Sequence, residues 1–371
     1  MTTGDLLPVS DDSAPSGRLA RAVAGLFPGY FALVMATGIV SIAGELLGWR
    51  AVAVALLAVN LPVYAILVLM TLARAVFHRR RLLADLADHA RGSGFFTTVA
   101  GTCVLGSQCL IVGGWRGPAQ VLLAAGLVLW AVVMYSFFTI VIVRRIKPSL
   151  ERGINGAWLI ATVATQSVAV LAITLRTPFG WPKEEVAFGA IVFFLIGCML
   201  YLAIITLIFY RFTFVSLLSV ALTPTYWITM GAVAITTLTG SALLLARDAS
   251  PLLAELRPFL LGFTLFFWAA GTWWVPLLMM LGIWRHAVRR YPFAYDPQYW
   301  GMVFPLGMYA AATWRLAQAL PFAPLEALAR VFLPLALALW AITAIGLVRH
   351  LVHGGHHGDG PRALDAEPAA R

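Results

Sequence analysis

Long uncharged, apolar runs alternate along the chain with short clusters of charged residues. A helix that crosses a bilayer needs roughly 17–25 predominantly apolar residues, and each run is long enough to qualify. A soluble α-helical protein does not need so many such stretches. The pattern therefore predicts ten transmembrane helices, within residues 27–49, 51–73, 92–115, 117–143, 153–175, 186–210, 212–246, 258–284, 297–314 and 331–348.

The predicted helices are of two alternating kinds. The odd-numbered ones are rich in Gly, Ala, Ser and Thr, whereas the even-numbered ones carry mostly bulky apolar side chains. Small residues allow helices to pack closely or to border a polar path, and bulky residues suit contact with lipid. The small-residue blocks recur at intervals of roughly 60–70 residues, about the length of a helical hairpin, as internal repeats of transporters do. We expect five hairpins, with the odd helices inside and the even helices outside.

Composition and charge agree with this class and set the orientation. Hydrophobic residues make up 61% of the 371 residues and charged residues only 11%, against about a quarter charged in soluble domains. With the N-terminus inside, 18 of the 26 Lys and Arg residues fall on the inner side and six on the outer; Arg315 and Arg330 lie at helix ends near the outer face. This bias predicts that both termini are cytoplasmic. It also accounts for the net charge of +10 without nucleic acid as a partner.

The first apolar run is too long for the h-region of a signal peptide, so we interpret it as a retained helix of a multi-pass inner (plasma) membrane protein. Three regions follow from the runs. Residues 1–24 are predicted to be a disordered cytoplasmic tail, residues 25–350 the ten-helix transport domain, and residues 351–371 a cytoplasmic tail that contains His and Gly.

Ionisable groups are almost absent from the predicted helix centres. All seven histidines fall in loops or the C-terminal tail, and no paired carboxylates or haem-spaced histidines occur within a helix. Intramembrane ionisable residues usually mark proton relays, metal sites or redox centres. We therefore expect no cofactor and no metal, and interpret the His353–Asp359 segment as a solvated tail rather than a metal site. The three cysteines show no disulfide or metal spacing and are expected to be buried thiols.

A path lined by neutral donors suits small anions. Hydroxyls, side-chain amides and backbone N–H groups freed at helix breaks donate hydrogen bonds without a fixed charge, and prolines at 62, 276, 305 and 334 supply such breaks. Tight packing without a pore is the alternative explanation of the small-residue blocks. The candidate lining residues on the odd helices are Thr37, Ser41, Thr102, Gln108, Thr165, Thr237 and Thr313.

Two segments carry a family resemblance. Residues 27–41 (FPGYFALVMATGIVS) and 299–313 (YWGMVFPLGMYAAAT) resemble the tellurite-resistance/C4-dicarboxylate transporter family, which also contains plant slow-type anion channels, a yeast malate permease and fungal sulfite exporters. The resemblance covers about residues 25–350. It implies a pseudo-fivefold ring of hairpins around a central pore, kinked inner helices and a homotrimer. It further implies a pore-plugging phenylalanine on the ninth helix, which is Phe304 here, with the kink at Pro305.

Three functions are compatible with these features. The first is transport of small anions (C4-dicarboxylate such as malate, sulfite, tellurite-type oxyanion, halide or nitrate) through a pore gated by Phe304. The second is a proton-coupled C4-dicarboxylate carrier, for which Glu45 is the available titratable group. The third is a membrane-embedded enzyme or sensor module, for which no catalytic constellation is visible. We favour the first, which is not an enzyme.

Overall fold

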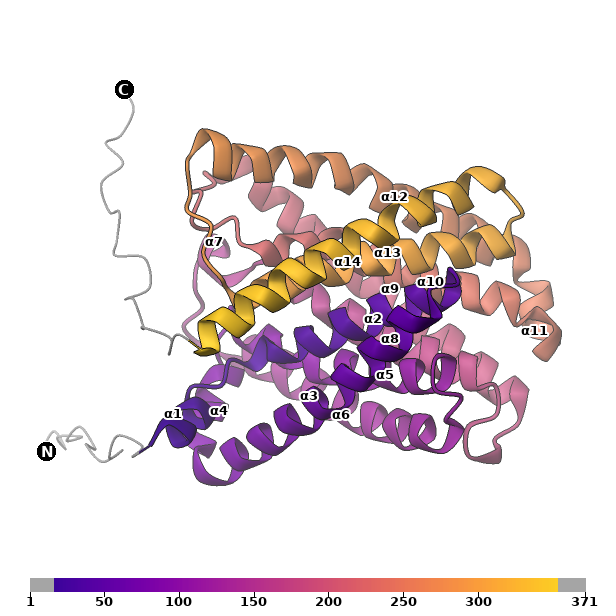
Figure 1. The fold of residues 1–371 in the computed structure, drawn as a ribbon, viewed down its shortest axis with the longest axis horizontal. Coiled ribbons are helices and arrows are strands. Elements are labelled where there is room, and N and C mark those ends of the chain that lie inside the picture. The colour runs from indigo at the N-terminus through magenta and orange to yellow at the C-terminus, as the bar shows by residue number, and fades with distance from the viewer. Residues whose placement is uncertain (1–16, 353–371) are drawn as a thin grey trace, which may run out of the picture.

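The structure, a computed structural model, describes residues 17–352, and every regular element within them is a helix. Ten long helices pair as five consecutive hairpins, as the apolar runs predict (Figure 1). The pairs are α2 (Ala32–Leu46) with α3 (Arg50–Phe77), α5 (Phe96–Ile111) with α6 (Arg116–Val143), α8 (Ile160–Leu175) with α9 (Lys183–Phe214), α10 (Ile228–Leu245) with α12 (Arg257–Ile283), and α13 (Trp300–Ala319) with α14 (Ala323–Val352).

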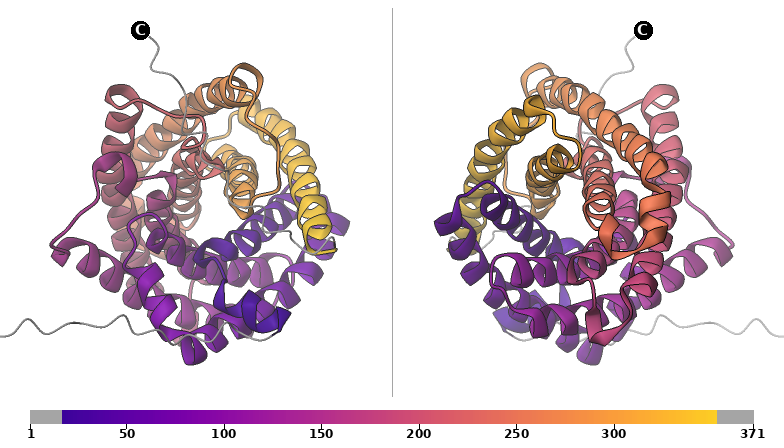
Figure 2. Two further views of the ribbon diagram at one scale, coloured as in Figure 1. Left: turned by 90° about the vertical axis from the view of Figure 1, so that its left-hand side faces the viewer. Right: turned by 90° about the vertical axis from the view of Figure 1, so that its right-hand side faces the viewer.

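The first helix of each hairpin belongs to a closed inner ring. Contacts join α2 to α5, α5 to α8, α8 to α10, α10 to α13, and α13 back to α2. The second helix of each hairpin (α3, α6, α9, α12 or α14) packs outside its own partner. End-on views show the inner helices enclosed by the longer outer ones (Figure 2). In the apolar stretches of α2, α5, α8 and α10, 72–89% of residues are buried, against 17–39% in the outer helices. The predicted division into inner and outer helices is confirmed.

Nine of the helices described between residues 17 and 352 are long and apolar enough to cross a membrane. The remaining inner helix, α13, contains Arg315, Gln318, Pro305, Tyr309 and two tryptophans, which lower its mean hydropathy. Its place in the closed ring shows that it spans the bundle alongside α10 and α2.

Each inner helix begins with a short 3₁₀ turn. These turns are η1 (Pro28–Phe31), η2 (Gly92–Phe95), η3 (Gly156–Leu159), η5 (Pro224–Trp227) and η8 (Pro297–Tyr299). Three of them open with proline, whose fixed φ suits a first helical position where the N–H has no partner within the helix. Neighbouring turns contact each other all the way round, from η1 through η2, η3, η5 and η8 back to η1.

Glycine permits this ring of turns to close, because backbone meets backbone there. A Cβ atom on Gly156 of η3 would overlap the backbone of Thr225 in η5, and one on Gly94 of η2 would lie 3.0 Å from the Gly29 nitrogen in η1. Side chains at these positions would force the turns apart. The turns therefore approach more closely than other residues would allow.

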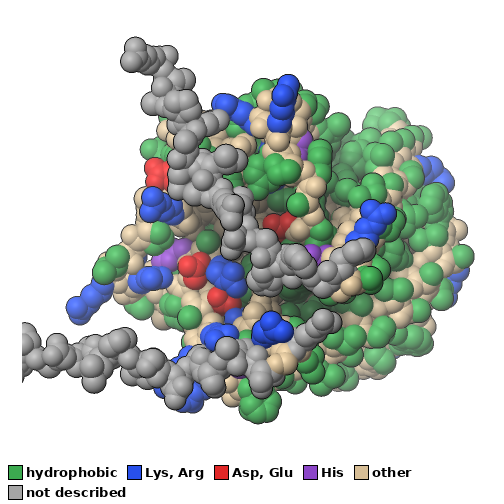
Figure 3. Space-filling view, turned by 60° about the vertical axis from the view of Figure 1, so that its left-hand side comes forward, with side chains coloured by type: hydrophobic (Ala, Val, Ile, Leu, Met, Phe, Trp, Pro, Cys, Tyr) green, Lys and Arg blue, Asp and Glu red, His purple; other side chains and the backbone are tan. Residues whose placement is uncertain are grey.

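Both ends of the described chain lie at the end of the bundle that carries the ring of turns, which we call the terminal face (Figure 1). The short helices α1 (Arg18–Ala24), α4 (Arg79–Leu86) and α7 (Leu150–Gly153) also lie there, whereas α11 (Pro251–Glu255) lies at the opposite end, the far face. Charged side chains gather at the terminal face and the flank is largely apolar (Figure 3). The connecting turns η4 (Pro178–Gly180) and η6 (Arg247–Ala249) and the π-helix η7 (Trp284–Val288) complete the structure.

At the N-terminal end the structure differs from the sequence prediction. Residues 18–24 form helix α1, although residues 1–24 were expected to be a disordered tail. Residues 353–371, which contain the His353–Asp359 segment, lie outside the described residues, as do residues 1–16. The buried state expected for Cys103, Cys109 and Cys198 is confirmed.

The close approach of η3 and η5 makes a mutational prediction. Gly156→Ala should reduce the free energy of unfolding by about 1–3 kcal/mol, because the new methyl group meets backbone that cannot rotate away. Gly189→Ala on α9 is the matched control, since a Cβ there has no atom within 4 Å, and it should be neutral or slightly stabilising. Unfolding of both purified variants in detergent measures the difference. Equal stability of the two would show that the turns are not closely packed.

Candidate functional site

Two cavities lie along the axis of the inner ring, and all five inner helices contribute to each. The far-side cavity has a volume of about 170 Å³. Its lining residues are Ile39, Ile42 and Leu46 of α2; Val104, Ser107 and Ile111 of α5; Ser167, Val170, Ile173 and Thr174 of α8, with Arg176 just beyond; Ile235, Leu238, Ala242 and Leu245 of α10, with Ala246; and Met308 and Arg315 of α13.

The terminal-side cavity is much smaller, about 30 Å³, and is enclosed by the ring of 3₁₀ turns. Most of its lining residues come from the turns and the first helical residues after them. They are Phe27, Gly29, Ala32, Met35, Gly94, Thr97, Ala157, Ile160, Thr225, Ile228, Pro297, Gln298, Gly301 and Phe304.

One to two helical turns separate the two cavities, because the nearest lining residues are four apart on α13 and α2 and seven apart on α5, α8 and α10. On α13, Phe304 lines the terminal-side cavity and Met308 the far-side cavity; on α2, Met35 and Ile39 divide in the same way. Residues four apart on a helix are about 6 Å apart along its axis, and residues seven apart are about 10 Å apart. The Phe304 side chain is completely buried. Apolar side chains therefore close the axis over a short distance between the two cavities.

The neighbour of Phe304 fixes the position of this segment of α13. Pro305 lies within the helix, and a Cβ on Gly231 of α10 would be only 2.8 Å from its ring carbon Cγ. Glycine at position 231 therefore makes room for the proline ring and lets α10 and α13 approach closely. Phe304 is thus attached to a tightly packed part of the inner ring.

Arginines are the charged side chains that line the far-side cavity. Arg315 donates from Nη1 to Gln318 Oε1 at 2.9 Å, which leaves its other N–H groups available. The hydroxyls of Ser107, Ser167 and Thr174 donate to carbonyl oxygens of their own helices and so present only oxygen to the cavity. Neither set of lining residues contains Asp or Glu. The side-chain charge along the axis is therefore positive and lies toward the far face.

The seven residues predicted to line the path lie in a different place. None is among the lining residues of either cavity, although all seven are buried. Four are threonines that bond an aromatic side chain from the outer helix of the preceding hairpin. The pairs are Tyr64–Thr102 (2.9 Å), Trp130–Thr165 (2.9 Å), Trp268–Thr313 (3.1 Å) and Trp340–Thr37 (2.9 Å), the last joining hairpin five to hairpin one.

The other three candidates also make contacts between or within helices. Ser41 donates to the carbonyl of Ala53 on α3 at 2.7 Å, and Gln108 accepts from Asn60 of α3 at 2.7 Å. Thr237 donates to a carbonyl of its own helix. The hydroxyl-rich blocks correctly mark the inner helices, but these side chains connect helices to one another. Arg176 and Arg315, which do line a cavity, were counted in the sequence only as charges near the outer side.

Glu45, the titratable candidate for proton coupling, lies in the last turn of α2. Its Oε1 forms an ion pair with Arg50 Nη1 at 2.7 Å, and neither cavity includes it. The carboxylate is therefore paired with Arg50 and does not line the axis, although the next residue, Leu46, lines the far-side cavity.

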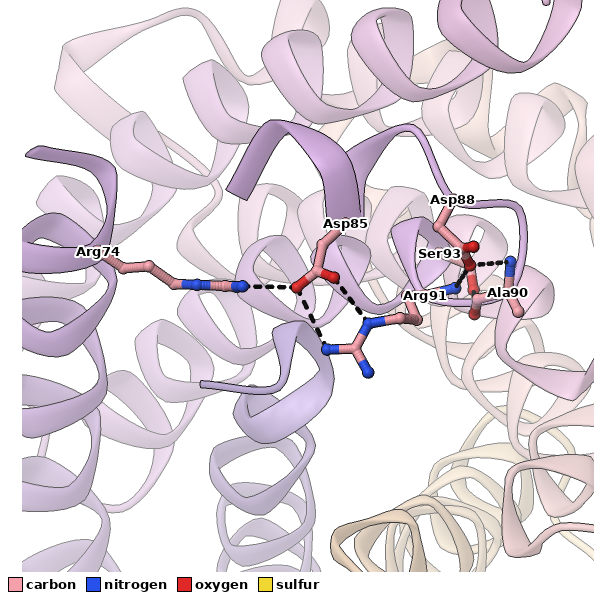
Figure 4. Close-up of polar contacts among 6 residues, drawn as sticks. All are labelled: Arg74, Asp85, Asp88, Ala90, Arg91 and Ser93. Carbon is pink, nitrogen blue, oxygen red and sulfur yellow. Dashed lines mark hydrogen bonds and ion pairs between the residues drawn. The ribbon is translucent and has the colours of Figure 1, made fainter. Parts of the chain in front are cut away.

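A cluster of charged side chains at the terminal face connects α3, α4 and the residue before η2 (Figure 4). Asp85 of α4 accepts from Arg74 of α3 at 2.6 Å and from Arg91 Nε at 2.7 Å. The Arg91 guanidinium also lies 5.5 Å from the ring centre of Phe27, which lines the terminal-side cavity. Burial by itself would raise the pKa of Asp85, but the hydrogen bonds and positive charges of Arg91 and Arg74 outweigh it and lower the pKa.

Five helical hairpins around a set of axial cavities define a multi-pass membrane transport protein. The chain matches the voltage-dependent anion channel (SLAC1) family over residues 26–348 and belongs to that family. This confirms the resemblance that residues 27–41 and 299–313 suggest. An uncharacterized transporter of Methanocaldococcus jannaschii is 28% identical over 86% of this chain and 91% of its own length. An uncharacterized membrane protein of Mycobacterium tuberculosis is 38% identical over 41% of this chain and 77% of its own length.

The lowered pKa of Asp85 predicts a pH-dependent contribution to stability. Asp85→Asn should reduce the free energy of unfolding at pH 7 by about 2 kcal/mol, because buried Arg74 loses its ionic partner. The folded-state pKa lies below the unfolded value of about 3.9. The contribution is therefore complete above about pH 4 and is lost as the pH falls through the folded-state value. Unfolding measured from pH 7 downward should show the difference between variant and wild type shrinking below about pH 4.

The exposed carboxylate variant Glu255→Gln is the control for this measurement. Glu255 lies at the end of α11 near the far face, and its substitution should change stability by less than about 0.5 kcal/mol. An Asp85→Asn difference that stayed constant down to pH 3 would contradict the role given to the ion pairs.

Proposed function

We propose that this protein transports small anions across the plasma membrane along the axis of its inner helix ring, with Phe304 as the gate. One observation carries the proposal: two cavities, each lined by all five inner helices, lie in line and are separated by one to two helical turns, with Phe304 between them. Membership of the voltage-dependent anion channel family supports it. C4-dicarboxylate, sulfite, tellurite-type oxyanions, halide and nitrate are the candidate solutes.

The charges support anions over cations. Arg176 and Arg315 line the far-side cavity without a carboxylate among the other lining residues. A cleft lined by one sign of charge raises the local concentration of ions of the opposite sign. We propose that these two arginines collect anions at the far-side mouth, where each offers N–H donors that the serine and threonine hydroxyls there do not.

The closed axis supports a gate. Phe304 is completely buried, and its side chain belongs to the apolar segment between the cavities. A charged solute cannot cross an apolar segment of this kind without a large desolvation cost. We propose that rotation of the Phe304 ring, beside a backbone held by Pro305, opens the axis. The further expectations are that the terminal face is cytoplasmic and that the protein is a homotrimer.

Removing the gate should increase the current. Phe304→Ala is expected to raise anion conductance at least about tenfold, which corresponds to a barrier lower by about 1.4 kcal/mol. Purified wild type and variant are compared in planar bilayers in chloride, nitrate, sulfite and malate, which also ranks the solutes. Phe267→Ala, a completely buried phenylalanine of outer helix α12, controls for loosened packing. Equal currents from folded wild type and Phe304→Ala would exclude Phe304 as the gate.

The proposed role of the arginines predicts that removing one of them lowers the anion current. In the Phe304→Ala background, Arg315→Gln should lower the anion current about three- to tenfold at low salt, with a smaller effect at 1 M salt because screening weakens the attraction. Arg257→Gln is the control, since Arg257 is an exposed residue at the start of α12 outside the cavity. If both variants conduct alike, the far-side cavity does not attract the anion.

A further inference from the structure

A larger hollow, of about 550 Å³, lies outside the inner ring near the terminal face. One wall is the last part of α12 and the π-helix η7, and the other walls are η5, the segment before it, and the first residues of α13. We call this hollow the flank groove. It does not share a lining residue with either axial cavity.

The groove contains a buried cation that lacks an ionic partner. Arg285 is only 7% exposed, its Nε has no hydrogen-bond partner, and it forms no ion pair within residues 17–352. Its guanidinium lies 4.1 Å from the ring centre of Tyr291, which is a weaker interaction than a carboxylate would give. A buried charge without a paired anion is costly. The arginine therefore favours an anionic group that comes from outside the chain.

The local backbone places this arginine at the groove. Residues Trp284–Val288 form a π-helix, with the Arg289 N–H donating to the Trp284 carbonyl at 2.9 Å. Such one-turn expansions often occur at functional sites. The segment that follows the π-helix is held against it, because the His286 ring stacks on Phe293 with ring centres 3.9 Å apart and forms a hydrogen bond with the Tyr291 carbonyl.

The rest of the groove is apolar and opens on the flank of the bundle. Met279 and Ile283 of α12, at its rim, are 54% and 59% exposed, and Phe293 is 79% exposed. The outer surface of α12, the orange helix along the top of Figure 1, is part of the surface that faces lipid in a spanning bundle. The ligand that fits therefore has both an apolar chain and an anionic head.

We propose that the flank groove binds an anionic phospholipid, with an acyl chain along the apolar wall and the phosphate at Arg285. The volume lies within the usual range of ligand sites, roughly 300–1,000 Å³. The position near one end of the spanning helices matches the level of lipid head groups, where basic pockets bind anionic lipids. Binding at this site does not depend on the anion path proposed above.

The test uses the full-length protein in neutral detergent with added phosphatidylglycerol or phosphatidylcholine. Native mass spectrometry counts bound lipid, and thermal unfolding gives the apparent affinity. Wild type should retain phosphatidylglycerol and be stabilised by it more than by phosphatidylcholine. Arg285→Gln should weaken phosphatidylglycerol binding about tenfold, as expected for loss of a charge-assisted contact with phosphate. Arg145→Gln, which removes an exposed positive charge between α6 and α7, should bind as wild type does.

A second pair of variants tests the groove itself and is independent of the charge. Gly282 lines the groove, and a Cβ there meets no atom within 4 Å, so Gly282→Trp should fill the groove and abolish preferential binding of phosphatidylglycerol. Gly262→Trp is the control on the same helix, where a Cβ is equally free but the groove is absent. If Arg285→Gln does not fold, the comparison of Gly282→Trp with Gly262→Trp still tests whether the lipid binds in the groove.

Three outcomes would overturn the proposal. The first is binding of phosphatidylglycerol by Arg285→Gln and Gly282→Trp at wild-type affinity. The second is that inorganic phosphate alone reproduces the stabilisation, which would indicate a site for free anions. The third is that Gly282→Trp changes the oligomeric state without changing lipid binding, which would indicate that a second copy of the chain covers the groove.

Discussion

The close approach of five 3₁₀ turns is the constraint on which the rest of the structure depends. Gly156 against Thr225, and Gly94 against Gly29, bring backbone to backbone, so the inner helices start from a tight ring at the terminal face. This convergence explains why the axial cavity there is only about 30 Å³ whereas the one at the far face is about 170 Å³. A path bounded in this way is narrowest near the turns, and Phe304 lies there.

The outer helices hold the ring by bonds that pass from one hairpin to the next. Four aromatic–threonine pairs join an outer helix to the following inner helix, and the pair between Trp340 and Thr37 joins the last hairpin to the first. At the contact between α9 and α10 the pattern differs, because Tyr201 of α9 accepts from Trp274 of α12 instead. In lipid each buried hydroxyl and indole N–H needs a protein partner. Four threonines of the inner helices are used in this way, and most of the other inner-helix hydroxyls donate to carbonyl oxygens three or four residues earlier in the chain. These bonds leave the axis more apolar than the composition suggests.

The sequence was sufficient to predict the five hairpins and the inner or outer place of each helix. Both follow from properties averaged over whole segments, namely the length of an apolar run and its content of small residues. The individual lining residues did not follow, because Thr37, Thr102, Thr165 and Thr313 lie on helices that are buried on every side. Burial all round removes the hydrophobic periodicity that would distinguish the axial face from the face against an outer helix. In the sequence, Arg315 is distinguished from the residues around it only by its charge. Its position at a cavity depends on how α13 is rotated within the ring, which the sequence does not show.

The direction of the inner helices gives the axis an electrostatic asymmetry. All five start at the turns, so five N-terminal ends, each equivalent to about half a positive charge, surround the terminal-side cavity. Five C-terminal ends, each with about half a negative charge, surround the far-side cavity and by themselves would repel an anion. Arg176 and Arg315 stand among these C-terminal ends, and two full positive charges offset most of that opposing potential. An anion then meets favourable potential on the terminal side and little opposing potential on the far side of the apolar segment at Phe304. The remaining barrier is therefore mainly one of desolvation and space, which movement of a single aromatic ring can change.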